Sequence, residues 1–312
     1  MREALRRVSL GYLVLAATAV AYLVVYSSRL GRFPTSFDYL SILNTTLPLV
    51  FVAIGQSLVV LTGGIDLSVG GIVSLCVAVT ASTVSTSALW LVAVLALGAA
   101  CGAVNGLIVA YGRIAPILTT LATLSVFTGL ALRVLPVPGG SIPPQVRHVL
   151  TNPATPTGLI WLGLAVAGWL VLRRTRFGMR VYAIGSDEAS ARAVGVPAAA
   201  VKLKVYALAG LCAALAAVFY VSTTTSGDAN AGAPFILTSI ASVVVGGVAF
   251  TGGRGSALGA VAGAVALTLV IDILFFAGID PLYQSLFQGL FLVVAVLLGT
   301  VAALAARRRR PA

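Results

Sequence analysis

The sequence has very few charged residues for its length. Only 9% of its 312 residues are Asp, Glu, Lys or Arg, whereas 59% are hydrophobic and the mean hydropathy is +1.07. A soluble domain carries about 25% charged residues, so this scarcity excludes a water-soluble globular chain. Length and apolar content together predict a single transmembrane domain over 1–312, an all-α polytopic membrane protein.

Residues that support catalysis or metal binding are also scarce. The only histidine is His148, and the only lysines are Lys202 and Lys204, which follow Val and Leu, so there is no P-loop. The three cysteines all fall inside apolar runs, without disulfide or Cys-x-x-Cys spacing: Cys76, Cys101 and Cys212. We therefore expect no enzyme activity, no cofactor and no metal site in this chain.

Nine charge-free runs divide the chain. They cover residues 8–28, 39–65, 67–112, 114–132, 148–172, 205–227, 229–253, 255–271 and 281–306. A membrane-crossing helix needs about 20 apolar residues. The run 67–112 is long enough for two spans, and the run from Gly255 must continue past Asp272 to Ala277. The sequence thus predicts ten spans, with both termini on one side of the membrane.

The distribution of basic residues gives the orientation. With both termini in the cytoplasm, 16 of the 20 basic residues lie inside, and only Arg29, Arg32, Arg133 and Arg147 lie outside. This split follows the positive-inside rule. The net charge of +12 then needs no nucleic acid partner, and we expect the basic run 307–310 to lie against anionic membrane lipid.

The cytoplasmic segment 173–204 is the most polar part of the chain, with nine of the 28 charged residues. It predicts a short helix from Asp187 to Val194, with Ser186 as the N-cap and Gly195 as the stop. Asp187 and Glu188 favour its first turn through the helix dipole. A helix shorter than about 12 residues is marginal in water, so we expect it to dock, either on its own membrane domain or on a partner.

Two glycine-rich stretches, 62–70 and 251–259, share Thr-Gly-Gly and a nearby serine. They indicate an internal repeat of two halves, about 1–150 and 151–312, as is common in transporters. Six of the 13 prolines lie between Pro136 and Pro156, which predicts a long external loop at the seam between the halves.

Five polar residues are candidates for the transport pathway or its gate. Asp66 and Ser68 either cap a tight cytoplasmic turn or line the pathway. Asn105 lies among glycines at 98, 102 and 106, a pattern that favours close helix packing over a ligand contact. Asp228 and Asn230 follow the seventh span, in a polar stretch from Ser222 that either is simply solvated or faces a delivered ligand.

Several motifs together resemble those of bacterial ribose-type ABC importer permeases. They lie at 61–70, 175–185, 191–195, 201–206 and 251–256, and the similarity extends from about Leu47 to Val301. This family includes permeases for ribose, xylose, other monosaccharides and a sugar-like signalling molecule. The chain departs from the family in its Gly185-Ser-Asp-Glu stretch and in Asp272, where many relatives carry an amide.

The resemblance implies a set of partners. Two permease subunits would form one pathway, two cytoplasmic ABC ATPase subunits would drive it, and a soluble sugar-binding protein would deliver the sugar to the outer face. The short cytoplasmic helix would be the coupling helix that docks on the ATPase. Its carried-over residues are Ser186, Asp187, Glu188, Ala189, Ala191, Arg192 and Gly195.

The expected function is therefore that of a permease subunit in the bacterial plasma membrane that imports a monosaccharide such as ribose or xylose. The alternative is a stand-alone secondary carrier or channel for a small polar solute. A coupled carrier usually buries several ionisable groups, and here only Asp272 lies deep in a predicted span, so the importer is favoured. No aromatic cage or carboxylate set selects a particular sugar.

Overall fold

The computed structural model describes residues 2–83 and 89–280, together with 283, 286, 287, 289, 290 and 293. Over these residues the chain forms helices and no strand, so the all-α prediction is confirmed for this part. The twelve helices found there are α1 (Arg2–Leu30), α2 (Ser36–Leu61), α3 (Val69–Thr83), α4 (Trp90–Ala110), α5 (Pro116–Val134), α6 (Pro144–Thr151), α7 (Thr157–Arg174), α8 (Arg176–Ser186), α9 (Glu188–Ala193), α10 (Ala198–Thr224), α11 (Ala233–Val245) and α12 (Ala257–Phe276).

Nine of these helices correspond to the first nine predicted spans. Seven are long and apolar enough to cross a membrane, namely α1, α2, α4, α5, α7, α10 and α12. The other two, α3 and α11, are shorter apolar helices of 15 and 13 residues. The tenth predicted span, 281–306, lies almost entirely outside the described residues.

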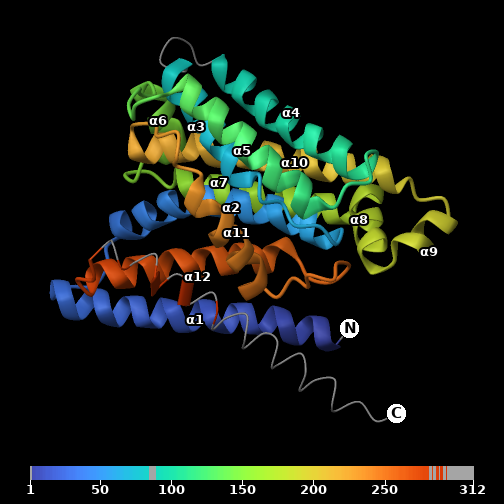
Figure 1. Cartoon of the computed structure of the whole chain (residues 1–312). Coiled ribbons are helices and arrows are strands. Elements are labelled where there is room, and N and C mark those ends of the chain that lie inside the picture. Colours follow the sequence, from blue (N-terminus) through green and yellow to red (C-terminus); the bar gives the residue numbers. More distant parts are fainter. Residues whose placement is uncertain are drawn as a thin grey trace.

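Helix α10 occupies the middle of the bundle, and α2, α3 and α4 pack against it. On the far side of α2, α12 packs against α1, so these two helices form the opposite flank (Figure 1). Tyr22 and Tyr26 of α1 and Leu269 of α12 form a small core of their own. The bundle thus has α2 and α10 at its centre and α1 at one edge.

Glycines allow α4 and α10 to approach until their backbones touch. A Cβ on Gly102 would meet the carbonyl oxygen of Tyr206, and one on Gly106 would lie 2.7 Å from Cα of Leu203. A Cβ on Gly210 of α10 would in turn meet the carbonyl oxygen of Gly98. The predicted role of the glycine series in close packing is confirmed, because only small residues permit this contact between helices.

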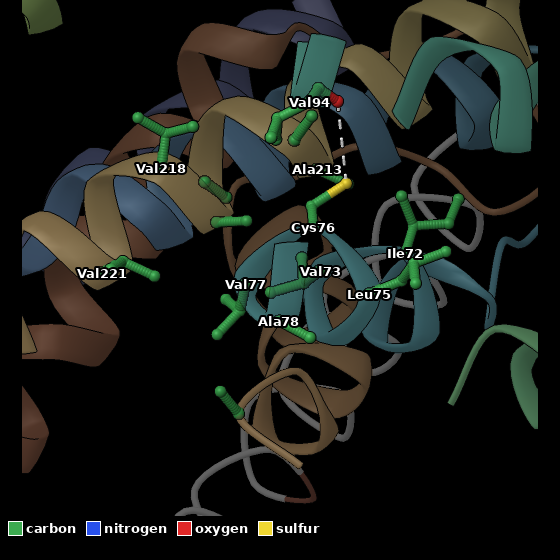
Figure 2. Packing of buried hydrophobic residues seen from close by; sticks show 14 of the residues in the cluster. Ile72, Val73, Leu75, Cys76, Val77, Ala78, Val94, Ala213, Val218 and Val221 are labelled. Carbon is green, nitrogen blue, oxygen red and sulfur yellow. Dashed lines mark hydrogen bonds between the residues drawn. The ribbon is translucent and has the colours of Figure 1, made fainter. Parts of the chain in front are cut away.

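The cysteines are small core residues, as predicted. Figure 2 shows Cys76 among aliphatic side chains of α3, α4 and α10, with its Sγ 3.9 Å from the carbonyl oxygen of Val94. Cys101 is also buried and Cys212 is half-buried, and all three are free. None of them therefore contributes a covalent link to the fold.

Two elements mark opposite ends of the bundle: α6 at one end, and the α8–α9 pair at the other (Figure 1). The predicted uninterrupted loop over 136–156 is wrong, because α6 forms within it. Pro144 stands at the start of that helix, where its missing N–H breaks no helical hydrogen bond. The polar stretch from Ser222 also begins as helix, since α10 continues to Thr224.

Gly102→Val tests the backbone contact between α4 and α10. The added side chain collides with the Tyr206 carbonyl, so we expect a loss of about 1–3 kcal/mol in stability from overpacking. The measurement is thermal unfolding of the detergent-purified chain. The matched control is Gly163→Val on α7, where a Cβ meets nothing within 4 Å. Equal melting temperatures for the two variants would show that the contact is not tight.

Candidate coupling site and translocation cavity

The polar segment after α7 folds into two successive helices, each with its own cap. Thr175 accepts a hydrogen bond from the backbone N–H of Gly178 and starts α8. Asp187 ends α8 in an extended conformation, and its carboxylate accepts from the N–H groups of Ala189 and Ser190, which starts α9. One aspartate therefore sets the bend between the helices.

The N-cap prediction for α9 was wrong by one residue. Ser186 is the last residue of α8 and donates its hydroxyl to the carbonyl of Tyr182. The ionised Asp187 is the better cap, because its two oxygens accept from Ala189, Ser190 and the Ser190 hydroxyl at once. Helix α8 itself was not predicted, although its buried Gly178, Val181 and Ile184 are spaced every three residues.

Glu188 fastens α9 to the start of α10. Its carboxylate lies 2.6 Å from the Arg192 guanidinium within α9 and 2.6 Å from the Lys202 ammonium of α10. The Arg192 contact has the i, i+4 spacing of an ion pair within one helix, whereas the Lys202 contact joins two helices. Partial burial opposes ionisation of Glu188, but hydrogen bonds from Lys202 and Arg192 outweigh it, so its pKa lies below the ordinary value.

Helix α9 presents small side chains outward while it is held from within. Ala191 is only 5% exposed and packs in the core shared with α8 and α10. Ala189 and Ser190 are exposed, and Val194 is 81% exposed at the end of the helix. Gly195 then stops the helix with φ of +83°. The exposed surface of α9 therefore combines small side chains with the charged side chains of Asp187 and Arg192.

The end of α8 touches both glycine-rich turns directly. A Cβ on Gly185 would meet the carbonyl oxygen of Leu61 and the backbone nitrogen of Gly253. Those two atoms are themselves hydrogen-bonded, with the Gly253 N–H donating to the Leu61 carbonyl at 3.0 Å. We call Leu61, Gly185 and Gly253 the backbone junction. It joins the end of α2, the end of α8 and the loop before α12.

Side chains reinforce this junction on the α12 side. The Tyr182 hydroxyl of α8 donates to the carbonyl of Gly255 at 2.9 Å. The Trp169 indole of α7 donates to the hydroxyl of Ser256, which also caps α12. The two Thr-Gly-Gly stretches noted in the sequence therefore meet in space at the cytoplasmic segment.

Three of the candidate pathway residues form one buried hydrogen-bond chain. Asp66, which is 1% exposed, accepts from the backbone N–H and the hydroxyl of Ser68. The Asn105 amide donates to the same hydroxyl, and the Thr123 hydroxyl donates to the Asn105 carbonyl oxygen at 2.7 Å. This chain links the turn after α2 to α4 and α5, and Asp66 caps that turn.

Asn230 lines a cavity of about 420 Å³ between α3, α5 and α11. Ser74 and Thr128 add hydroxyl groups to its wall, and no charged side chain lines it. Asp228 does not line the cavity; its carboxylate accepts a hydrogen bond from the backbone N–H of Asn230 and stabilises the turn. The rest of the cavity lining is mostly apolar. In the described part of the chain, no group of three or more His, Cys, Asp or Glu side chains is placed to hold a metal.

The Glu188 contacts predict a pH dependence for α9. A carboxyl whose pKa is lowered by folding stabilises the fold above its unfolded pKa, about 4.3, and this stabilisation is lost as pH falls through the folded value. At pH 7, Glu188→Gln should accelerate hydrogen exchange of the α9 amides about two- to fivefold, because partly exposed ion pairs contribute ~0.2–1 kcal/mol.

Once the pH is below the folded pKa of Glu188, the wild type and Glu188→Gln should exchange at equal rates. Comparing the two proteins at each pH removes the intrinsic pH dependence of exchange. Asp228→Asn, at a distant turn, is the control and should leave α9 unchanged throughout. A ratio of exchange rates that does not vary with pH would contradict the ion-pair explanation.

Comparisons with known proteins agree with this architecture. Residues 39–296 match the family described as branched-chain amino acid transport system / permease component. Ribose import permease protein RbsC of Escherichia coli (strain K12) is 35% identical over 286 residues, covering 88% of this chain and 89% of the relative. Galactose/methyl galactoside import permease protein MglC of the same strain is 30% identical, covering 94% and 96%.

A third relative, autoinducer 2 import system permease protein LsrD of Photorhabdus laumondii, is 31% identical and covers 78% of each chain. No solved structure matches this chain. The family predicted from the motifs is confirmed by these matches. The chain belongs to this family of transport-system permeases, and it is a multi-pass membrane transport component rather than an enzyme.

Proposed function

We propose that this chain is the membrane-spanning subunit of an ATP-driven importer for a monosaccharide such as ribose or xylose. The observation that carries the proposal is α9, a short helix braced from within by Glu188 and Ala191 and exposed outward at Val194. The similarity to import permeases for ribose and for galactose supports the substrate class.

The proposed topology has ten spans in a single domain over 1–312, both termini in the cytoplasm, and two halves that meet near 150. It is supported by the 16-to-4 split of basic residues. The location of α6 and of α8–α9 at opposite ends of the bundle agrees with it (Figure 1). The cytoplasmic segment 173–204 then faces the compartment that holds ATP.

In this proposal the ATPase docks on the segment that runs from Ser186 to Gly195. The backbone junction would pass its movement to two membrane helices at once, since Gly185 touches the end of α2 and the loop before α12. From Leu61 the route continues through the turn to Asp66 and along the buried chain to Thr123 of α5. Helix α5 forms one wall of the cavity lined by Asn230.

The cavity lined by Asn230, Ser74 and Thr128 is the part of the pathway we assign to this subunit. Its hydroxyl and amide groups can exchange hydrogen bonds with a sugar, and no charge holds the sugar too tightly for release. The cavity is open on the exposed face of α5, so a second permease subunit would complete the wall. A soluble sugar-binding protein would deliver the sugar at the α6 end.

The topology is tested by cysteine labelling in a chain that lacks the three native cysteines. Gln145→Cys in α6 and Ala189→Cys in α9 place single exposed thiols at the two ends of the bundle. We expect an impermeant thiol reagent to label only Gln145→Cys in intact cells, and both variants in broken membranes. Labelling of Ala189→Cys from outside would reverse the orientation.

Val194→Asp tests the docking surface. An exposed valine loses little packing in the free subunit, whereas a carboxylate buried against a partner costs enough to weaken binding about tenfold or more. We expect lower ATPase co-purification and lower ligand-stimulated hydrolysis, with normal insertion. Ile114→Asp, the same change at an exposed residue of the α4–α5 loop, should retain both. Full ATPase binding by Val194→Asp would exclude this surface.

A further inference from the structure

A second cavity, of about 330 Å³, lies between α2, α7 and α10 and has an almost wholly apolar wall. Its wall includes Phe51, Leu58, Trp161, Trp169, Leu172 and Leu208. Along α7 the lining runs from Trp161 to Leu172, which at a rise of about 1.5 Å per residue is a length of about 16 Å. The cavity is therefore elongated and parallel to the helices.

The polar atoms of the wall are turned away from the cavity. The Trp161 indole donates to the carbonyl of Val149, and the Trp169 indole donates to the Ser256 hydroxyl. Only the faces of these rings and aliphatic side chains are left to contact an occupant. A sugar would leave its hydroxyl groups unpaired here, so the occupant must be apolar over this length.

The cavity opens on the outer side of α7, a predicted membrane span. Leu164 in its wall is 56% exposed, and Gly168 one turn further is exposed as well. At this depth the surrounding solvent is the hydrocarbon of the bilayer. The apolar group that the bilayer supplies at this depth is a lipid acyl chain.

Basic residues lie beyond one end of this cavity, and none lines its wall. Arg173 lies one turn beyond Trp169 on α7, and Lys204 lies one turn before Leu208 on α10, so each continues a row of lining residues. Both are exposed, and no ion pair joins either to another described residue. Lys202, in contrast, is already paired with Glu188.

We propose that this cavity and the two basic residues form a binding site for one anionic phospholipid. An acyl chain fills the cavity, and the headgroup phosphate lies between Arg173 and Lys204 at the cytoplasmic surface. Long basic side chains reach the headgroup level while their stems stay on apolar surface, and basic pockets at cytoplasmic helix ends favour anionic lipids. The site rests on the cytoplasmic orientation that belongs to the proposed function.

The test is lipid binding to the purified full-length chain, measured by native mass spectrometry with dioleoyl phosphatidylglycerol or dioleoyl phosphatidylcholine. We expect phosphatidylglycerol to be retained about tenfold more than phosphatidylcholine. The double variant Arg173→Gln/Lys204→Gln should lose this preference. The matched control Arg113→Gln/Arg254→Gln removes two exposed basic residues from other loops and should keep it.

Gly168→Phe tests the acyl-chain part, because a Cβ at this position meets nothing within 4 Å and the ring can enter the cavity. It should reduce retention of both lipids about tenfold. Equal retention of the two lipids by the wild type, or no effect of either variant, would overturn the proposal. So would disulfide cross-linking of Gly168→Cys between two chains, which would assign the cavity to a second copy. None of these readouts uses sugar or ATPase, so they are independent of transport.

Discussion

Backbone-to-backbone contact is the constraint on which this structure depends. A membrane interior supplies no hydrophobic drive between helices, so association relies on close packing of small residues. At the middle of the bundle, Gly102 and Gly210 bring α4 and α10 together until carbonyl oxygens fill the space that side chains would take. The other spans are arranged around this pair, with α2 and α3 also packed against α10.

Backbone-to-backbone contact also occurs at the proposed cytoplasmic end, where it joins three segments rather than two helices. At Gly185 the helix that carries α9 meets Leu61 and Gly253, so three separate segments share one contact. The buried chain from Asp66 to Thr123 begins five residues beyond Leu61 and ends on α5, the helix that forms one wall of the cavity lined by Asn230. Under the proposed function, these contacts would form a short mechanical path between the docking segment and the cavity.

Much of this was accessible from the sequence, for identifiable reasons. The long apolar runs predicted the positions of nine helices, because a membrane requires length and apolarity together. Local caps predicted α9 to within one residue at its start. What was missed depends on residues distant in the chain: Lys202 reaching Glu188, and Gly185 against Leu61. Helix α8 was not predicted because only three of its residues are buried, which is a weak apolar pattern.

The backbone junction also bears on how such a subunit could change over evolutionary time. Because the contact at Gly185 is made by main-chain atoms, no substitution there can adjust it gradually; any side chain separates the segments. Ala189 and Val194 are not constrained in this way, since both are exposed at the surface of α9. Under the proposed docking on α9, a new ATPase partner could therefore be accommodated by substitutions at Ala189 and Val194, while the backbone junction behind them stays the same.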